Sequence, residues 1–510
     1  MKPFVNIVDE IIGDLNSKKT NGRTFGEEFQ LESIPLWWFY RRFLTSHVLP
    51  KQFNTVQLVE GKKVAMWQRP YYRLIQFVFQ QYFKYNEKLK LRSVNRNKTT
   101  KSLQKKVLFL TYTNHFNQKT GEVYRINSIV KKLEQDKKLK PLTLFVDPLS
   151  QRSYTQLKNL ENTIYQYIEK EELERANQIA QELHQKWASL DKNQIFGRQW
   201  KGLRYTLNFF FSPEFIHNIA LYYLAMKRVL VEESIHCVTL TSRNGFFEKC
   251  IIAAASKLNI PVIVVQHGMG MGTSDPELFP GMKIAVFGEA YQEKLLQWNM
   301  DEKDVVITGP IIFEDIHQHI QKKQVQTGKI LVITDQYVEE NYISKEEYFA
   351  KMRILLRQLH SLGKEIIVKL HPVEKYFTEY VAIVEKEGWK NVMVTQEHGS
   401  AVLYRLINDS DLVVNSYSTV ALEAMILGKP ILTINIGPSL VPNIEDSIFA
   451  GGIHALLQDD LAKAAAEALH DSAFWKAKRN KIVKKYCYKI DGKAVQRLVD
   501  VMYNIKSEDQ

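Results

Sequence analysis

The sequence predicts an α/β protein in which two Rossmann-like, doubly wound parallel-sheet domains follow an N-terminal helical extension. Three observations favour this fold class. From residue 106 onward, short apolar runs alternate with stretches of helical length, a pattern typical of parallel sheets covered by helices. The alternation occurs twice, and 510 residues are too many for one hydrophobic core. Basic residues are concentrated before residue 106, which sets that segment apart.

The N-terminal extension, residues 1–105, carries 19 lysines and arginines but only 8 aspartates and glutamates. It contains two aromatic runs, 34–43 and 71–83, and a basic stretch at 84–101 follows the second. Aromatic helices with a basic flank suit an anionic membrane surface. The alternative is a helical subdomain packed on the body, with a solvated basic linker, which the sequence slightly favours. A nucleic-acid partner is disfavoured because no RNP, helix-turn-helix or zinc-finger pattern is present.

Targeting and redox signals are few. No stretch reaches the roughly 18 uninterrupted apolar residues of a spanning helix, and the start of the chain is acidic rather than apolar. Cys237, Cys250 and Cys487 form no CxxC pair, so neither a zinc cage nor a disulfide framework is predicted. We expect a cytoplasmic protein, peripheral at the inner face of the cell membrane if residues 1–105 bind lipid.

The first Rossmann-like domain is predicted over residues 106–315, with a helical insert at about 150–230. Its expected helices are 121–133 and 247–258. Its expected strands are 106–113, 142–146, 237–241, 261–265, 284–287 and 305–308.

The second Rossmann-like domain is predicted over residues 316–510. Its expected helices are 345–362, 400–407 and 418–427, and its expected strands are 329–335, 365–370, 391–395, 411–415 and 431–435. Ligands of such sheets bind beyond the carboxyl ends of the strands. The residues directly after these strands are therefore the candidates for a binding site.

The strand ending at Asn415 gives the most informative of these segments. Ser416, Ser418 and Thr419 form the turn into the next helix. Free backbone N–H groups and hydroxyls at a helix start bind phosphate without a metal, although an ordinary N-cap has the same sequence pattern. Glu423, further along that helix, fits either a ribose ligand or a partner of the helix dipole.

The neighbouring strand ends add polar and charged groups. Thr334 and Asp335 follow one strand, and the segment 395–398 follows another. Lys369 ends a third strand just before His371 and Pro372. Proline fixes the backbone after the histidine, which can then donate a proton to a leaving phosphate.

In the first domain, Gln266, His267 and Gly268 follow the strand 261–265 and precede a glycine-rich turn, 269–272. His267 is expected to face a cleft as a general base; a histidine packed in the core is the alternative. The glycine spacing is not that of the GxGxxG fingerprint. No HExxH, loop DxD or Walker A pattern is present, so we expect no metal and no cofactor.

Taken together, these segments resemble the donor domain of bacterial GT-B surface-polysaccharide transferases. The resemblance is to capsule transferases, to sialyltransferases with a His-Pro and a Ser-Ser/Thr motif, and to teichoic-acid glycerophosphotransferases. It covers about 106–470. The matching segments are Lys369–Pro372, Asp411–Thr419, Glu423-Ala424 and Gly428–Pro430, with Gln266–Gly268 and Val306–Pro310 at the acceptor-domain end.

The resemblance implies an inverting, metal-independent glycosyltransferase that uses a CMP- or UDP-activated sugar and a polysaccharide or glycolipid acceptor. His371 and the 416–419 turn would hold the donor phosphate, and Glu423 the ribose. His267, or less readily His115, would take the proton of the acceptor, with Gln266 and Gly268 on the acceptor side. The donor-binding residues implied are Thr334, Asp335, Lys369, His371, Pro372, Ser416, Ser418, Thr419 and Glu423.

The chain departs from the teichoic-acid enzymes at one motif. Those enzymes carry Ser-Ser followed by an acidic residue, whereas this chain has Ser418-Thr419-Val420.

Two other functions share this fold. A UDP-sugar 2-epimerase is one alternative, although such enzymes typically have Gly-Gly where this chain has Ser416-Tyr417-Ser418. A non-catalytic GT-B scaffold is the other, and it predicts no nucleotide binding.

Overall fold

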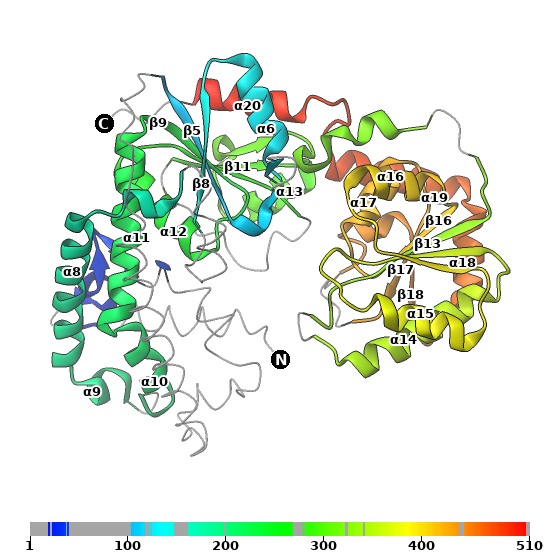
Figure 1. Ribbon diagram of the computed structural model, residues 1–510, viewed down its shortest axis with the longest axis horizontal. Helices are drawn as coiled ribbons and strands as arrows, with labels where there is room; N and C mark the ends of the chain where they lie inside the picture. The colour runs from blue at the N-terminus through cyan, green and yellow to red at the C-terminus, as the bar shows by residue number, and fades with distance from the viewer. Residues whose placement is uncertain are drawn as a thin grey trace. The chain divides into compact units, whose positions relative to one another are not determined.

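The computed structural model describes residues 19–20, 23–36, 38–39, 104–117, 122–123, 125–146, 162–197, 200–268, 279, 281–321, 325–339, 342–437 and 443–505. The chain divides into two compact units. The first comprises 1–267, 272–285 and 499–510, and the second comprises 268–271 and 286–498. Two six-stranded parallel sheets with flanking helices form the framework, so the predicted α/β, GT-B-like fold class is confirmed (Figure 1).

The first sheet has the strand order β12-β11-β10-β9-β5-β8. All six predicted strands occur, with ends shifted by at most two residues. Their bounds are β5 (Lys106–Thr111), β8 (Lys140–Phe145), β9 (Ile235–Leu240), β10 (Val262–Val265), β11 (Met282–Val286) and β12 (Val305–Ile307). The direction of winding reverses between β5 and β9, which makes that pair the switch point of this sheet.

Helices cover this sheet and extend beyond it (Figure 1). They are α6 (Asn127–Asp136), α8 (Lys170–Ser189), α9 (Lys192–Phe196), α10 (Trp200–Phe210), α11 (Pro213–Glu232) and α12 (Phe246–Lys257). The predicted helix at 121–133 begins later than expected, because Glu122–Val123 pair as β7 with β6 (Phe116–Asn117). Helix α11 is apolar on most faces because it packs against α8 and α12.

The described part of the N-terminal extension forms short elements: β1 (Lys19–Thr20), β2 (Arg23–Thr24), α2 (Phe25–Glu28), β3 (Gln30–Leu31) and β4 (Ile34–Pro35). Its aromatic side chains point into the first unit. Phe29 packs on Trp187 and Phe211, and the indole N–H of Trp38 donates to the carbonyl of Lys249 at 3.0 Å.

The second aromatic run, 71–83, and the basic stretch 84–101 lie outside the described residues, so lipid binding by 1–105 stays a prediction. Among the helices that the structure does describe, none combines the length and apolar character needed to cross a bilayer.

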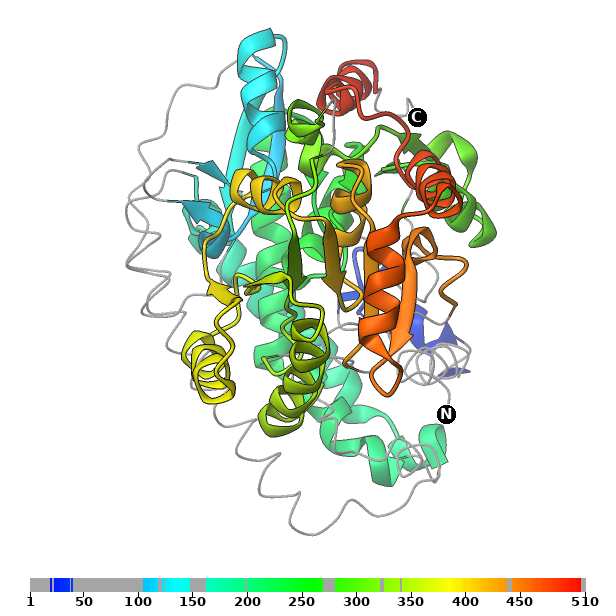
Figure 2. The ribbon, with the colours of Figure 1, turned by 90° about the vertical axis from the view of Figure 1, so that its right-hand side faces the viewer.

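The second sheet has the order β15-β14-β13-β16-β17-β18, which is the Rossmann order with its switch point between β13 and β16. Figure 2 shows the strands and helices of this unit from a second direction. The strands are β13 (Lys329–Ile333), β14 (Glu365–Lys369), β15 (Val392–Thr395), β16 (Leu412–Asn415), β17 (Ile431–Asn435) and β18 (Ile453–Leu456). Five were predicted; β18 was not, because four residues after Gly451-Gly452 give little periodic signal.

The helices of this unit are α13 (Glu289–Gln297), α14 (Lys345–His360), α15 (Phe377–Glu387), α16 (Ser400–Asn408), α17 (Val420–Ile426), α18 (Leu461–His470), α19 (Ala473–Tyr486) and α20 (Ala494–Asn504), the last continuing into the first unit. Helix α14 shows how they are specified. Ser344 caps it by accepting from the N–H of Glu347, and Met352, Leu355, Leu356 and Leu359 form one apolar face.

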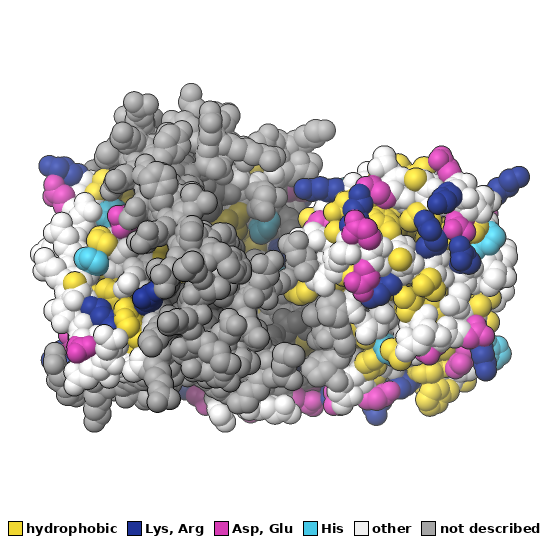
Figure 3. Space-filling model, turned by 90° about the horizontal axis from the view of Figure 1, so that it is seen from below, with side chains coloured by type: hydrophobic (Ala, Val, Ile, Leu, Met, Phe, Trp, Pro, Cys, Tyr) yellow, Lys and Arg dark blue, Asp and Glu magenta, His cyan; other side chains and the backbone are white. Residues whose placement is uncertain are grey.

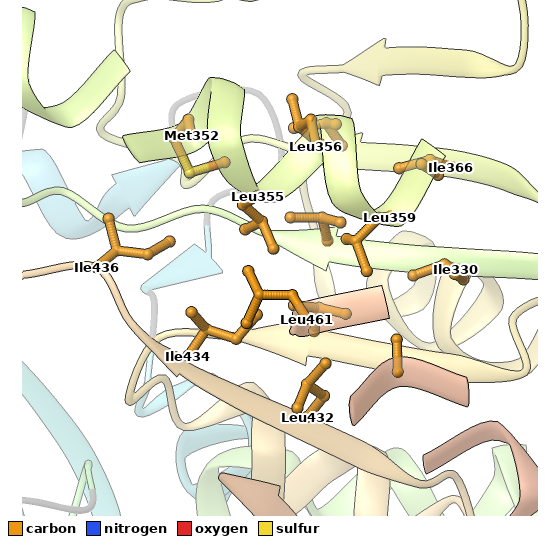
Figure 4. Packing of buried hydrophobic residues seen from close by; sticks show 14 of the residues in the cluster. Ile330, Met352, Leu355, Leu356, Leu359, Ile366, Leu432, Ile434, Ile436 and Leu461 are labelled. Carbon is orange, nitrogen blue, oxygen red and sulfur yellow. The ribbon is translucent and has the colours of Figure 1, made fainter. Parts of the chain in front are cut away.

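That face of α14 packs on the sheet and on α18 (Figure 4). The partners labelled there are Ile330, Ile366, Leu432, Ile434, Ile436 and Leu461. Buried aliphatic packing of this kind fixes the strands against one another. The strand ends, and the polar residues after them, are therefore held by a rigid support.

Candidate functional site

The carboxyl edge of the second sheet brings the predicted strand-end segments together. Strands β15, β14, β13 and β16 are consecutive neighbours in a parallel sheet, so the segments after them lie side by side along one edge. The switch point places Thr334, directly after β13, beside Asn415 and Ser416 at the end of β16. Ligands of doubly wound sheets bind at this position.

His371 is held by three hydrogen bonds in the turn after β14. Its backbone N–H donates to the Thr334 hydroxyl at 2.9 Å, and its carbonyl accepts from the N–H of Glu374 at 3.0 Å. Its ring Nδ1 lies 3.3 Å from the N–H of Val373 and accepts from it. Burial, and then the neighbouring charge of Lys369, lowers the pKa of the imidazole. The ring is therefore neutral near pH 7, and this hydrogen bond assigns its proton to Nε2.

Lys369 is a buried cation at the end of β14. It is 6% exposed, and its ammonium donates to the carbonyl of Leu370 at 3.3 Å. Burial lowers its pKa, while the carboxylate of Glu423 acts in the opposite direction. A buried ammonium whose hydrogen-bonding capacity is only partly used is suited to bind an anion.

Glu423, from α17, is 9% exposed. Burial raises the pKa of its carboxyl to about 8, Asp315 raises it further, and the Tyr404 hydroxyl and Lys369 oppose the rise. The carboxyl therefore holds a proton in most molecules at pH 7 and can both donate and accept hydrogen bonds. A solvated partner of the helix dipole would not be buried in this way.

The turn after β16 contains both inward and outward groups. Ser416 is buried, and its carbonyl and hydroxyl lie 2.9 and 3.2 Å from the hydroxyl of Tyr337, so this serine points into the unit. Ser418 and Thr419 are half-buried, and Ser418 accepts from the N–H of Val420 at 3.4 Å. Of the three predicted hydroxyls, Ser418 and Thr419 remain accessible to a ligand.

Tyr417 has a backbone φ of +60°, a conformation that glycine adopts without strain. Its hydroxyl lies 3.0 Å from Nε2 of His454 on β18, and its ring packs edge-on against Phe449 at 5.2 Å between centroids. This turn therefore has a tyrosine at a position where glycine is the usual residue. Nothing in the residue pattern had singled out this conformation.

Other predicted residues contribute less to the edge. Pro372 and the segment 396–398 are exposed, and Glu397 pairs with Arg405 at 2.8 Å. Asp335 is half-buried, and its carbonyl accepts from the Tyr348 hydroxyl at 3.4 Å. Sequence reasoning missed Glu374 and Tyr337, because a loop glutamate and a tyrosine carry no signal of burial.

The candidates in the first unit follow β5 and β10. Gln266 is buried, and its N–H donates to the carbonyl of Ala285 at 2.9 Å. His267 is exposed, which excludes the packed core histidine, and Gly268 is half-buried. His115 lies in the 3-10 turn after β5, with its ring 5.8 Å from that of Tyr112. Their catalytic and acceptor-side roles stay predictions.

The charge of the second unit gives no strong long-range attraction for an anion. On the face of this unit that Figure 3 shows, lysines and arginines are interspersed with acidic residues. Across the residues that the structure describes, no three or more His, Cys, Asp or Glu side chains are grouped so as to hold a metal ion. Ligand selectivity at this edge would therefore come from the buried groups.

Comparisons with known proteins bear on the reaction. Residues 284–503 match the model of the UDP-N-acetylglucosamine 2-epimerase family. The match covers less than half of the 510 residues but includes the whole second sheet and every candidate at its carboxyl edge. No curated protein matches the chain at a significant level.

Solved structures of low sequence identity are similar in fold. The UDP-GlcNAc 2-epimerase of Neisseria meningitidis bound to UDP-GlcNAc is 13% identical, with a TM-score of 0.48, over 78% of this chain and 99% of that one. The Methanocaldococcus jannaschii enzyme in complex with UDP-GlcNAc and UDP is 15% identical, with a TM-score of 0.46, over 79% and 99%. Acinetobacter baumannii MurG is 12% identical, with a TM-score of 0.42, over 78% and 99%.

The expected glycosyltransferase function is wrong on this finding, because the matching family is one of epimerases, the alternative considered above. The resemblance to capsule, sialyl and teichoic-acid enzymes is not confirmed beyond the shared fold. The physical reason is that the motifs at the strand ends concern phosphate and ribose, which both kinds of enzyme bind. They do not specify what happens at the sugar.

Proposed function

We propose that the protein is a nucleotide-sugar 2-epimerase, acting on UDP-N-acetylglucosamine or a close relative. The observation that carries the proposal is the family match over 284–503, which spans β13 to β18 and the residues after them. The buried charges at this edge support it, because they offer what a nucleoside diphosphate requires.

The proposed contacts follow from the geometry. The ammonium of Lys369 and the Nε2–H of neutral His371 would meet the diphosphate, aided by backbone N–H groups in the turn at Ser418 and Thr419. The partly protonated carboxyl of Glu423 would hydrogen-bond the ribose hydroxyls, which act as donors and acceptors at once. Of these groups the Lys369 ammonium would supply positive charge, and the others would supply hydrogen bonds.

Epimerisation at C2 requires removal of the C2 proton and its return to the opposite face of the sugar. The diagnostic experiment is incubation of the protein with UDP-N-acetylglucosamine in D₂O, followed by NMR. We expect a second UDP-sugar with inverted C2 and deuterium at that carbon. Unchanged UDP-N-acetylglucosamine without deuterium would reject the proposal.

Two variants localise the activity. His371→Ala removes the proposed phosphate donor and should lower turnover at least tenfold, since a lost hydrogen bond to a charged group corresponds to roughly that factor. Arg405→Ala removes an exposed side chain that pairs with Glu397, and should leave turnover unchanged. Equal losses in both variants would place the activity elsewhere.

A further inference from the structure

The loop between Pro372 and α15 has an inverted burial pattern. Val373 is 52% exposed, whereas Glu374 is only 6% exposed. Pro372 and Lys375, on either side, are also exposed. A carboxyl group is thus the one buried side chain of a four-residue surface loop, and an apolar neighbour faces solvent instead.

This arrangement opposes the ordinary preference of both residues. Burying a carboxyl costs free energy unless hydrogen bonds compensate, and exposing valine gains nothing. Burial raises the pKa of Glu374 to about 7, and the charge of Glu339 acts in the same direction. Hydrogen bonds with the Thr334 and Tyr380 hydroxyls lower this pKa and so limit the rise. The second unit therefore tolerates a costly group at this point of the loop.

The hydrogen bonds of Glu374 converge on His371. The Thr334 hydroxyl donates to the carboxylate of Glu374 and accepts from the backbone N–H of His371, the latter at 2.9 Å. The backbone N–H of Glu374 donates to the carbonyl of His371 at 3.0 Å. Both backbone polar groups of the histidine are therefore tied to the Thr334–Glu374 pair.

The pair is itself anchored in the core of the second unit. Thr334 is buried, and its N–H donates to the carbonyl of Lys369 at 3.2 Å, which continues the sheet. Tyr348 of α14 and Tyr380 of α15 lie beside Glu374, with their hydroxyls 3.1 Å apart, and both belong to the apolar core. Core side chains beneath the loop therefore fix Thr334 and Glu374, and these two residues fix the position of His371.

We infer that Glu374, acting through Thr334, is the positioning residue for His371: it holds the histidine backbone so that Nδ1 accepts from Val373 and Nε2–H is presented to the phosphate. The inference rests on the proposed function for the identity of the ligand, but the geometry of His371 is measurable without any ligand.

The test compares Glu374→Ala, Glu374→Gln and Thr334→Val with Glu379→Ala. Glu379 is a matched control, because it lies on α15 close to the same loop and pairs with Lys345 at the surface. The ¹⁵N NMR signals of the His371 ring, assigned with His371→Gln, report its tautomer. Calorimetric titration with UDP reports affinity.

We expect Glu374→Ala and Thr334→Val to shift the His371 signals and to weaken UDP binding about tenfold. Glu374→Gln keeps an oxygen that accepts from Thr334, so it should retain the tautomer and most of the affinity. Glu379→Ala should change neither. If Glu374→Ala does not fold, Thr334→Val carries the same prediction.

Unaltered His371 signals in both Glu374→Ala and Thr334→Val would overturn the inference. So would a Glu374→Gln protein with native signals and native affinity but no turnover, because Glu374 would then transfer protons itself. Failure of the proposed function looks different: the wild-type protein would not epimerise UDP-N-acetylglucosamine, while the response of His371 to Glu374→Ala would remain.

Discussion

Between α8 and α11 in the first unit, Arg228 lies within 3.3 Å of four carboxylates: Glu169, Glu171, Glu172 and Glu232. At the carboxyl edge of the second sheet, by contrast, three buried ionisable side chains have no oppositely charged atom within 4 Å among the residues described: Lys369, Glu374 and Glu423. Only Arg228 and Glu172 of the first group are largely buried, whereas all three side chains of the second group are, so the more deeply buried charges are the less compensated ones.

The pKa shifts follow this difference. Burial alone would lower the pKa of Arg228, but the hydrogen bond to Glu172 and the surrounding carboxylates raise it. At the second-sheet edge burial prevails, and the pKa values of Lys369 and Glu423 move toward the neutral forms. In the first unit, paired charges connect α8 and α11. At the second-sheet edge, buried ionisable groups that lack an oppositely charged neighbour among the described residues are typical of a ligand-binding site.

The largest expected effect is in the paired region. Arg228→Ala leaves Glu172, which is buried, without its cation, and should lower the free energy of unfolding by about 3–5 kcal/mol. Denaturant unfolding of the purified protein measures it. Lys170→Ala is the matched control, since it removes an exposed pair with Glu174 on the same helix and should cost about 0.5 kcal/mol or less. If Arg228→Ala lowers the free energy of unfolding no more than Lys170→Ala does, the paired charges do not stabilise the first unit and the contrast between the two regions fails.

Glu423→Gln should have the next largest effect, and a stabilising one. The carboxyl has a raised pKa when folded, so its contribution to stability is complete below about pH 4.5 and is lost as the pH rises through about 8. The amide cannot ionise. The variant should therefore match wild type near pH 4.5 and exceed it by on the order of 4 kcal/mol near pH 8.5.

Thermal unfolding at several pH values measures that gain. Glu379→Gln is the control of opposite sign, because its hydrogen bond to Lys345 lowers the pKa of Glu379. That substitution should reduce the Tm at neutral pH and have less effect as the pH falls below the ordinary carboxyl range. If both variants show the same dependence of Tm on pH, the pKa of the Glu423 carboxyl is not raised in the folded protein.

Lys369→Met should separate stability from binding. Methionine replaces a buried ammonium that has no carboxylate oxygen within 4 Å among the residues described, so the Tm should stay equal or rise, while UDP affinity should fall about tenfold, or about 1.4 kcal/mol. Lys390 lies two residues before β15, at the amino ends of the strands, so Lys390→Met should leave affinity unchanged. A variant that loses stability but keeps UDP affinity would make Lys369 a structural residue.

The sequence predicted most strands of both sheets, because buried parallel strands are short apolar runs ended by polar residues. It also placed Lys369 and His371 at the carboxyl edge of the second sheet, since strand ends meet there, and Glu423 in the helix after β16; their roles stay predictions. It could not locate Glu374, whose position in an exposed loop gives no sign of burial. Nor could it show that Ser416 turns inward to Tyr337, because both depend on contacts between distant segments.

The smallest expected effect concerns backbone strain at the same edge. Tyr417 has a φ of +60°, a region that costs a non-glycine residue about 1 kcal/mol or more. Tyr417→Ala keeps that strain and loses the contacts with His454 and Phe449, whereas Tyr417→Gly loses the contacts and relieves the strain. Glycine should therefore be the more stable of the two variants by about 1 kcal/mol, the reverse of the order in helices and strands.

Asn259, at φ +52° after α12 in the first unit, provides the comparison. Asn259→Gly should likewise be more stable than Asn259→Ala by about 1 kcal/mol, so the backbone preference itself is common to both regions. They should differ in UDP affinity: only the substitutions at Tyr417 act on the turn that presents Ser418 and Thr419. If Tyr417→Ala and Tyr417→Gly both bind UDP like wild type, the turn is strained without serving the ligand, and the contrast between the regions then rests on buried charge alone.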